Sequence, residues 1–446
     1  MKRIRFAAAA AAGTVLLGGI TACGAGDDPA GPVTITLLEY QQARVDVLEK
    51  LIPQFEEDMK AEGKDIEVEL VADILTDGDF KTKVTQQLHA GTAPDVLDTG
   101  GSQLTGWAAA GYLLELDDHL DEWEDWGDFY EVSRDRAQEA DGHVYSVPHE
   151  GSVQSLFYRE DVLTDLGIDT EQPETWYELI ERLEAVTEKT GEPSIVLPAG
   201  TAWGQGTWTE GFLPIVAGTG DTLFDQESGT WQLEGEGLDA SFDLFSELTE
   251  KGLLPVEDLL NPNPWEPTKY VSFAEGTLPV AAQGTWGWRY DWGPEGSAPI
   301  EDVEEKVGTW NYPALVDGTE PYSIAGGGFS FAINAESEHP DEAVELAKWL
   351  SSGEAIATQL AAVGAASPRA GIADIEPYAS EPVLLDAEEK LQSSIAPPTG
   401  EGSDQIAQAV QNATGDILLG DADGSEAADA FAREAEEFLG PDLIAE

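Results

Sequence analysis

The chain has 446 residues, enough for two or three domain-sized units with large cores, and 41% of its residues are hydrophobic, which is typical of a folded chain. It carries 87 acidic and 22 basic residues, a formal net charge of −65. Such a surface repels nucleic acid and anionic lipid headgroups, so we expect no nucleic-acid partner. We attribute the excess of acids to a solubilising surface suited to a saline or cell-wall environment, where salt screens charge strongly.

The N-terminus predicts export and attachment to a membrane. Residues 1–22 have a short basic opening and an apolar run over 6–20, the layout of a signal peptide. That run is too short for an ordinary membrane-spanning helix, which needs about 20 residues. It ends in ITAC at Cys23, which resembles a bacterial lipobox, and Cys23 is the only cysteine of the chain. We therefore predict lipidation of Cys23 and a flexible tether over 23–32; the alternative is a plain secretory signal with an incidental cysteine.

Strand-like and helix-like segments alternate along the rest of the chain. Strands are predicted, in chain order, at 33–40, 66–72, 95–97, 144–161 (two runs), 195–199, 278–283 and 329–334. Helices are predicted at about 45–55, 80–89, 102–107, 175–190, 241–250 and 340–350, and from about 381 to the C-terminus. Ser102 is expected to cap one helix, and a capping box beginning at Thr175 another. The alternation predicts an α/β fold with a largely parallel sheet.

Six segments, in order, resemble one known family. They are GTAPDVLDTGG with GWAAAGYLLELDDHL, VYSVPHEGSVQSLFYREDVL, PETWYELIERLEAV, FAEGTLPVAAQGTWGW and GGGFSFAINAESEHPDEAVELAKWL, together with the lipobox. The family is that of the extracellular solute-binding proteins of carbohydrate ABC importers, the maltose-binding-protein-like family 1. The likeness covers nearly the whole mature chain.

This resemblance implies a two-lobed periplasmic-binding-protein fold of type II, with hinged lobes that each contain a mostly parallel sheet flanked by helices. We expect an N-terminal lobe from 33–147 and 327–368, and a C-terminal lobe from 148–326 and 369–446. The chain would cross between the lobes near Pro148, near 326–329 and near 367–371. Open α/β sheets bind ligands at the carboxyl ends of their strands, which places the site between the lobes.

The expected ligand contacts follow these strand ends. A pyranose offers hydroxyls to planar Asp, Glu and Gln groups and an apolar face to an aromatic ring. By position in the family's segments, the predicted contacts are Gln41, Gln42, Asp98, Gly101, Glu150, Trp208, Glu210, Trp286 and Gly327. Two of them have an alternative, because Asp98 could cap the following helix and Glu150 could be a solvated acid. Structural roles are expected for Trp288, Trp292 and Arg369.

The resemblance implies a lipoprotein on the outer face of the bacterial cytoplasmic membrane. It would capture a neutral di- or oligosaccharide and deliver it to the permease subunits of an ABC importer, as a monomer without cofactor or metal. The five histidines show no metal-ligand spacing, and no G-x-S-x-G nucleophile elbow occurs. The DADG sequence at 421–424 is expected to cap a helix. A secreted glycoside hydrolase remains the enzymatic alternative, because the separation of paired carboxylates is a three-dimensional property. A passive adhesion protein is a third possibility.

Overall fold

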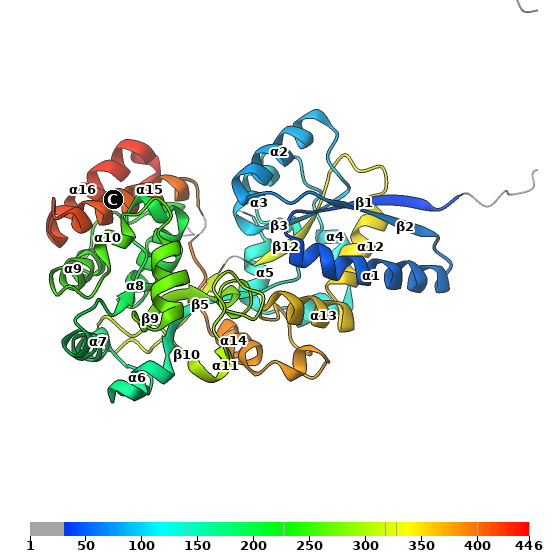
Figure 1. The fold of residues 1–446 in the computed structure, drawn as a ribbon. Coiled ribbons are helices and arrows are strands. Elements are labelled where there is room, and N and C mark those ends of the chain that lie inside the picture. The colour runs from blue at the N-terminus through cyan, green and yellow to red at the C-terminus, as the bar shows by residue number, and fades with distance from the viewer. Residues whose placement is uncertain are drawn as a thin grey trace, which may run out of the picture. The chain divides into compact units, whose positions relative to one another are not determined.

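The structure is a computed structural model that describes residues 31–139, 141–225, 228–316, 318–326, 328–398 and 400–445. The predicted signal peptide, the predicted lipidation site Cys23 and the predicted contact Gly327 lie outside these ranges. Residues 33–446 form one unit by their contacts, and of the preceding unit, 1–32, only residues 31 and 32 are described. The unit from residue 33 onward contains two large sheets, each with its own helices (Figure 1).

The first sheet and its helices, called here the first lobe, have the strand order β2-β1-β3-β12-β4. The strands are β1 Val33–Glu39, β2 Ile66–Ala72, β3 Val96–Gly100, β4 Ser146–Pro148 and β12 Phe329–Ile333. The helices are α1 Gln42–Ala61, α2 Asp77–Ala90, α3 Gly101–Ala109, α4 Asp117–Asp121, η1 Glu124–Asp128, α5 Glu131–Ala137, α12 Pro340–Leu350 and α13 Gly353–Val363. Alternate residues of β1 enter two apolar clusters, Leu37 in one and Leu38 in the other, so this sheet is covered on both faces.

The second sheet and its helices, the second lobe, have the strand order β10-β5-β9-β6, with β11 also paired to β5. The strands are β5 Ser152–Arg159, β6 Ile195–Val196, β9 Val280–Gly284, β10 Val307–Trp310 and β11 Ile324–Gly326, and a separate pair is β7 Phe224–Asp225 with β8 Thr230–Trp231. The α-helices are α6 Glu160–Leu166, α7 Trp176–Thr190, α8 Leu213–Ala217, α9 Glu236–Glu250, α10 Val256–Leu259, α11 Val303–Lys306, α14 Pro382–Gln392, α15 Ser403–Leu419 and α16 Gly424–Leu439. The 3₁₀- and π-helical segments are η2 Thr201–Trp203, η3 Thr207–Phe212, η4 Glu266–Phe273, η5 Thr285–Trp288, η6 Tyr378–Ser380 and η7 Pro441–Leu443. One large apolar cluster fills this lobe.

Two connections carry the chain between the sheets. The chain leaves the first sheet at the end of β4 and enters the second at β5, through residues 149–151, and it returns between β11 and β12. These connections lie against each other, because a Cβ atom placed on Gly328 would stand 1.9 Å from the carbonyl oxygen of Glu150. Only glycine fits at position 328 without moving one of the connections.

The α/β fold class is confirmed, but the expectation of mostly parallel sheets is wrong. β1 runs parallel to β2 and β3, whereas β12 is antiparallel to β3 and β4, and β5 is antiparallel to β9, β10 and β11. The reason is the position of the connections between the sheets. Strands that begin at such a connection, β5 and β12, must run opposite to neighbours that end there, such as β4 and β11.

Most predicted elements match the structure, but only two of the three predicted helix caps do. Thr175 accepts a hydrogen bond from the backbone N–H of Glu178 at the start of α7, and Asp423 forms a full capping box with Glu426 at the start of α16, as expected for DADG. The prediction for Ser102 is wrong, since α3 begins after Gly100, which forms no side-chain cap.

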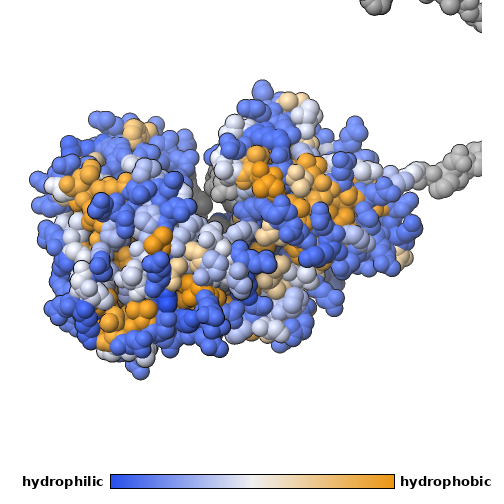
Figure 2. Space-filling model, in the orientation of Figure 1, coloured by the Kyte–Doolittle hydropathy of each residue, from blue (hydrophilic) through white to orange (hydrophobic). Residues whose placement is uncertain are grey.

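Figure 2 shows a face on which hydrophilic residues predominate. None of the helices in the described ranges has the length and apolar character needed to cross a membrane.

Candidate functional site

A pocket of about 230 Å³ opens where β9 ends in the second lobe. Aromatic and charged side chains from three stretches of the chain, 203–210, 265–270 and 283–291, meet in it. The residues that line it are Trp203, Gly206, Glu210, Trp265, Lys269, Tyr270, Gln283, Trp286 and Asp291. Pockets that combine an aromatic surface with a few converging polar groups are typical of sites for small molecules.

Three indole rings provide the apolar part of this pocket. Trp286 and Trp203 are half-buried, and Trp265 is 36% exposed. The rings of Trp203 and Trp265 meet edge to face, with their centroids 6.4 Å apart. The Trp286 ring lies directly over Gly284, where an added Cβ atom would stand 1.9 Å from the nearest ring carbon. The Trp286 ring can therefore occupy this place only because residue 284 has no side chain.

The polar part of the pocket is a buried network centred on Lys269. Lys269 Nζ lies 2.6 Å from Glu210 Oε2 and donates a second hydrogen bond to Gln283 Oε1 over 3.1 Å. The Gln283 amide donates to Asp291 Oδ2, and the Tyr270 hydroxyl donates to Asp291 Oδ1. Burial raises the pKa of Asp291 to about 6, although Lys269 acts in the opposite direction. The network carries two carboxyl groups and one ammonium, and it presents both donors and acceptors to the pocket.

Two of the segments that supply this network are π-helical. Glu210 lies in η3, and Lys269 and Tyr270 lie in η4. π-Helical turns are rare and occur frequently at functional sites. Both π-helical segments contribute side chains to the same pocket, which supports a binding role for it.

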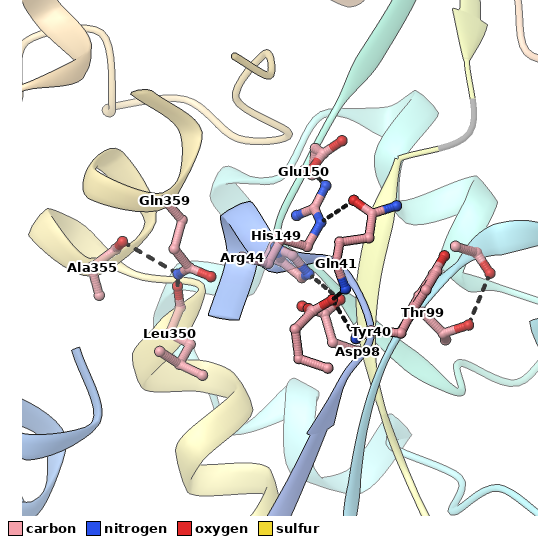
Figure 3. A network of polar contacts seen from close by, with 12 residues as sticks. Tyr40, Gln41, Arg44, Asp98, Thr99, His149, Glu150, Leu350, Ala355 and Gln359 are labelled. Atoms are coloured by element: carbon pink, nitrogen blue, oxygen red, sulfur yellow. Dashed lines mark hydrogen bonds and ion pairs between the residues drawn. The ribbon is translucent and has the colours of Figure 1, made fainter. Parts of the chain in front are cut away.

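A second polar cluster lies in the first lobe, at the carboxyl ends of β1 and β3 (Figure 3). Arg44, the first buried residue of α1, forms an ion pair with Glu150 and donates through Nε to Gln41 Oε1 over 3.2 Å. Its guanidinium carbon also lies 3.8 Å from the ring centroid of Phe329. On the other side of the cluster, His149 Nε2 lies 2.8 Å from Asp98 Oδ1.

Burial perturbs the ionisation of this cluster. Burial raises the pKa of Asp98 to about 6, and burial together with the Arg44 charge lowers the pKa of His149 to about 3, so this imidazole is neutral at pH 7. Burial by itself would lower the pKa of Arg44, but the carboxyl groups that face it, Glu150 first among them, raise it above its ordinary value. Perturbed titrations of this kind concentrate at functional sites.

A hydrogen bond joins the two clusters. Tyr290 follows η5 in the second lobe, and its hydroxyl donates to Gln41 Oε1 in the first lobe over 2.9 Å. The Tyr290 backbone N–H donates to the carbonyl oxygen of Trp286 over 2.8 Å. The aromatic pocket of one lobe is thus connected through a short chain of contacts to the polar cluster of the other.

A third feature lies beside the connections between the sheets. Arg136 of α5 lines a small cavity together with Glu150, Ser133 and Ser330. Its guanidinium has no hydrogen-bond or ion-pair partner within the described ranges, and burial lowers its pKa. An unpaired, half-buried arginine is unusual in a chain with about four acids for each base.

The structure brings together some of the predicted site residues and separates others. Gln41, Asp98 and Glu150 lie in the first-lobe cluster, and Glu210 and Trp286 lie in the second-lobe pocket. Gln42 is exposed, and its side-chain amide donates to Asp46 on the surface of α1. Trp208 is 4% exposed and packs in the core of the second lobe, and Gly101 is the first residue of α3.

The alternatives left open by the sequence can now be decided. Asp98 does not cap α3, because its carboxyl group contacts His149. Glu150 is not a freely solvated acid, because its side chain is 11% exposed and paired with Arg44. The structural roles expected for three residues are confirmed: Trp288 and Trp292 are buried in the core, and Arg369 forms ion pairs with two aspartates near η1.

Several site residues escaped the sequence analysis. Trp203 and Trp265 line the pocket, and Lys269 holds its acids together. Trp203 stands five positions before the predicted contact Trp208; Trp203 lines the pocket, whereas Trp208 packs in the core. The signal for Trp265 is its position between two prolines, where a large apolar side chain has no periodic helix or strand to bury it.

Comparison with known proteins gives one family. A family model described as bacterial extracellular solute-binding protein matches residues 42–357. An arabinooligosaccharide-binding protein of Halalkalibacterium halodurans is 25% identical over 47% of this chain and 44% of that protein. A lactose-binding protein of Rhizobium radiobacter is 24% identical over 64% of this chain and 65% of that protein, and a diacetylchitobiose binding protein of Streptomyces coelicolor is 25% identical over 68% and 71%. The match therefore spans less than two thirds of the length of the first two relatives.

Solved structures give the same fold. The sugar-binding protein MalE from Xanthomonas citri superposes with a TM-score of 0.75 at 21% identity, over 91% of this chain and 97% of that one. A cyclic alpha-maltosyl-1,6-maltose binding protein from Arthrobacter globiformis superposes with a TM-score of 0.74 at 21% identity, over 92% and 99%. At this identity the similarity establishes the two-lobed architecture.

Among the described residues, no group of three or more His, Cys, Asp or Glu side chains is arranged to hold a metal ion.

Proposed function

The chain belongs to the bacterial extracellular solute-binding proteins, and we propose that it captures a neutral di- or oligosaccharide between its two lobes and delivers it to the permease of an ABC importer. The observation that carries the proposal is the pocket of Trp203, Trp265 and Trp286 above the Lys269 network. Indole faces stack on the C–H face of a pyranose, while the network's carboxyl, amide and ammonium groups hydrogen-bond its hydroxyls.

The charge of the pocket supports an uncharged ligand. Lys269, its one ammonium group, is already paired with Glu210 and bonded to Gln283, so no free cation is left in the pocket to hold a phosphate or a carboxylate. Three indoles offer more apolar surface than one sugar ring covers, which favours more than one ring. Relatives that bind an arabino-oligosaccharide, lactose and diacetylchitobiose support the same class.

We place the hinge at the two connections between the sheets, keep the third crossing expected near 367–371, and keep the expected lobes, 33–147 with 327–368 and 148–326 with 369–446. A ligand held by the second-lobe pocket would recruit the first-lobe cluster, and the closed form would dock on the permease. The hydrogen bond from Tyr290 to Gln41 supports such a meeting of the two surfaces. The contacts proposed for the ligand are Gln41, Glu150, Glu210 and Trp286 of the original set, with Trp203 and Trp265 added.

The family places the protein outside the cytoplasm. We further propose that lipidated Cys23 holds it on the outer face of the membrane, that it acts as a monomer, and that it catalyses no reaction. No observation favours the hydrolase alternative, because Glu210 is paired with Lys269, and Asp291 already accepts hydrogen bonds from Gln283 and Tyr270.

A thermal-shift screen tests this proposal. The panel contains maltose, lactose, diacetylchitobiose and an arabino-oligosaccharide, with glucose 6-phosphate and glucuronate as charged comparisons. A ligand present at 100 times its Kd stabilises the folded state by about 2.7 kcal/mol, which raises the melting temperature measurably. We expect at least one neutral oligosaccharide to do so and the charged sugars to have no effect. If only the charged sugars raised the melting temperature, or if no member of the panel did, the proposed ligand class would be wrong.

A further inference from the structure

Two carboxyl groups in the first-lobe cluster meet in the protein interior. Glu39 ends β1 and Asp98 lies in β3, and the parallel register that pairs Leu38 with Leu97 places the two acids opposite each other on one face of the sheet. They are 0% and 1% exposed. The Asp98 carboxyl group raises the pKa of Glu39 further, after burial, as expected of two acids that are close neighbours in the interior.

One oxygen of each acid has an identified partner. Glu39 Oε1 accepts the backbone N–H groups of Tyr40 and Gln41, each over 2.6 Å, and Asp98 Oδ1 faces His149 Nε2. The other two oxygens, Glu39 Oε2 and Asp98 Oδ2, have no N–H or O–H donor within the described ranges. A buried carboxyl oxygen without a donor is costly, and one hydrogen shared between the two acids would give both oxygens a partner.

The groups around the pair cannot supply that hydrogen. The titratable and charged groups that face it are Arg44 from α1, His149 and Glu150 from the first connection, and Tyr290 from the segment after η5. The Arg44 guanidinium is already engaged with Glu150 and Gln41, and the neutral His149 ring is held against Phe331, with centroids 4.0 Å apart. With both acids ionised, the cluster would carry three carboxylates against one guanidinium.

We propose that Glu39 and Asp98 share one proton in the folded protein, and that this buried acid pair positions the backbone of Tyr40 and Gln41 and the Arg44–Glu150 ion pair at the binding surface. The shared proton replaces a repulsion between two buried charges by a charge-assisted hydrogen bond. It also leaves Glu39 Oε1 free to accept the backbone N–H groups of Tyr40 and Gln41. These two bonds position the Gln41 side chain, which accepts the hydrogen bond from Tyr290.

The sign of the pH dependence of stability follows from the linkage between proton binding and folding. Burial, and then the neighbouring Asp98, raise the pKa of Glu39 well above its ordinary value of 4.5. The folded chain therefore holds a proton that the unfolded chain releases above that ordinary value. The contribution is complete below about pH 4.5 and is lost as the pH rises through the raised pKa, with up to a tenfold change in the unfolding constant per pH unit for one proton.

The test is Glu39→Gln, studied by urea denaturation between pH 5 and pH 9. The new amide keeps an oxygen for the N–H groups of Tyr40 and Gln41, and its NH₂ donates permanently to Asp98 Oδ2. We expect the variant to lose the pH dependence contributed by about one proton and to exceed the native protein in stability at the alkaline end. The control is Glu69→Gln on the exposed face of β2, which should leave the native profile unchanged.

Two results would overturn the proposal. One is a variant that is less stable than the native protein at every pH with an unchanged slope, as expected if Glu39 is a plain carboxylate neutralised by Arg44. The other is a folded Asp98→Asn variant that keeps the native slope, and this variant decides the matter if Glu39→Gln fails to fold. The measurement needs no ligand, so its failure leaves the proposed sugar site standing, and a failed sugar screen leaves the shared proton standing.

Discussion

At the scale of single residues, the ammonium group of Lys269 holds the second-lobe pocket together. Lys269 is 4% exposed, and its partner Glu210 is 12% exposed at the side chain. A buried ion pair adds little over an apolar replacement of both partners, but removal of one partner leaves an uncompensated buried charge.

The first prediction concerns Lys269→Met. The substitution leaves Glu210 and Asp291 buried without their cation, and we expect a loss of about 3–5 kcal/mol in the free energy of unfolding, measured by urea denaturation at pH 7. The matched control is Lys251→Met, which breaks surface pairs with Glu184 and Glu247 and should cost about 1 kcal/mol or less. Equal losses in the two variants would mean that the network is not buried as described.

The second prediction concerns Gly284→Ala. The added Cβ atom would stand 1.9–2.3 Å from carbons of the Trp286 ring, so the ring must leave its place in the pocket. We expect saccharide affinity to fall by about 1–3 kcal/mol, the range for truncating a buried aromatic contact, while the melting temperature changes little. Titration calorimetry measures the affinity. Full affinity in a folded variant would show that the position of Trp286 does not matter for binding.

The residues of the site were predictable only in part. Trp286 was predicted because it follows a strand, and Glu210 was predicted by its position in the family's segments. Neither signal requires knowledge of packing. Trp208 and Trp203 are five positions apart. Trp208 lies in η3 and is buried in the core, whereas Trp203 ends η2 and lines the pocket, and no sequence period encodes this difference. Glu39 was missed because it reads as the last residue of a strand, and its burial depends on Asp98 from the neighbouring strand.

At the scale of elements, the connections between the sheets are closely packed against each other. Gly328 lies against the Glu150 carbonyl oxygen, and Gly151 leaves no room for a side chain beside Leu391. Elements that move relative to each other need such connections to absorb the change in backbone angles.

The third prediction is that Gly328→Ala alters the hinge. Its Cβ atom would stand 1.9 Å from the Glu150 carbonyl oxygen and force the two connections apart. We expect a weaker compaction on addition of saturating saccharide, measured by small-angle X-ray scattering, than the native protein shows. The control is Gly106→Ala in α3, where an added Cβ meets no atom within 4 Å. Identical compaction in all three proteins would place the hinge elsewhere.

The strands of the first sheet were well predicted, whereas β10, β11 and α13 were missed and the strand directions were not predicted. Alternating and helical periodicities located every strand of the first sheet, because apolar spacing reports which face is buried. Strand direction depends on where each strand begins in space. β12 and β5 begin at connections between the sheets, and the sequence contains no signal for the sense in which they join their neighbours.

At the scale of the whole molecule, the charge sets the conditions under which the fold is stable. Removal of the three basic residues of the predicted signal peptide changes the formal net charge from −65 to −68. Such a charge repels itself in the compact state, and added salt screens this repulsion.

The fourth prediction is that sodium chloride stabilises the protein. Between dilute buffer and 1 M salt the Debye length falls to about 3 Å, and we expect the melting temperature to rise over that range. A parallel series with trimethylamine N-oxide separates screening from exclusion of a solute from the surface. A melting temperature that falls with salt would mean that attractive ion pairs outweigh the net repulsion.

At this scale the net charge and the composition follow from the sequence directly and need no coordinates. The lobes, their shared connections and the ligand class followed from the family resemblance rather than from periodicity. The meeting of Tyr290 with Gln41, 249 positions apart in sequence, is a property of the folded chain alone.

The account rests on a neutral saccharide bound against Trp286, and titration calorimetry of the native protein and of Trp286→Ala tests it most directly. The titrant is the saccharide that gives the largest thermal shift, and Tyr177→Ala, an exposed aromatic on α7, is the control. We predict one site per chain in the native protein and the control, and an affinity lower by about 1–3 kcal/mol in Trp286→Ala. Equal affinity in all three proteins, or no heat from any neutral saccharide, would contradict the account.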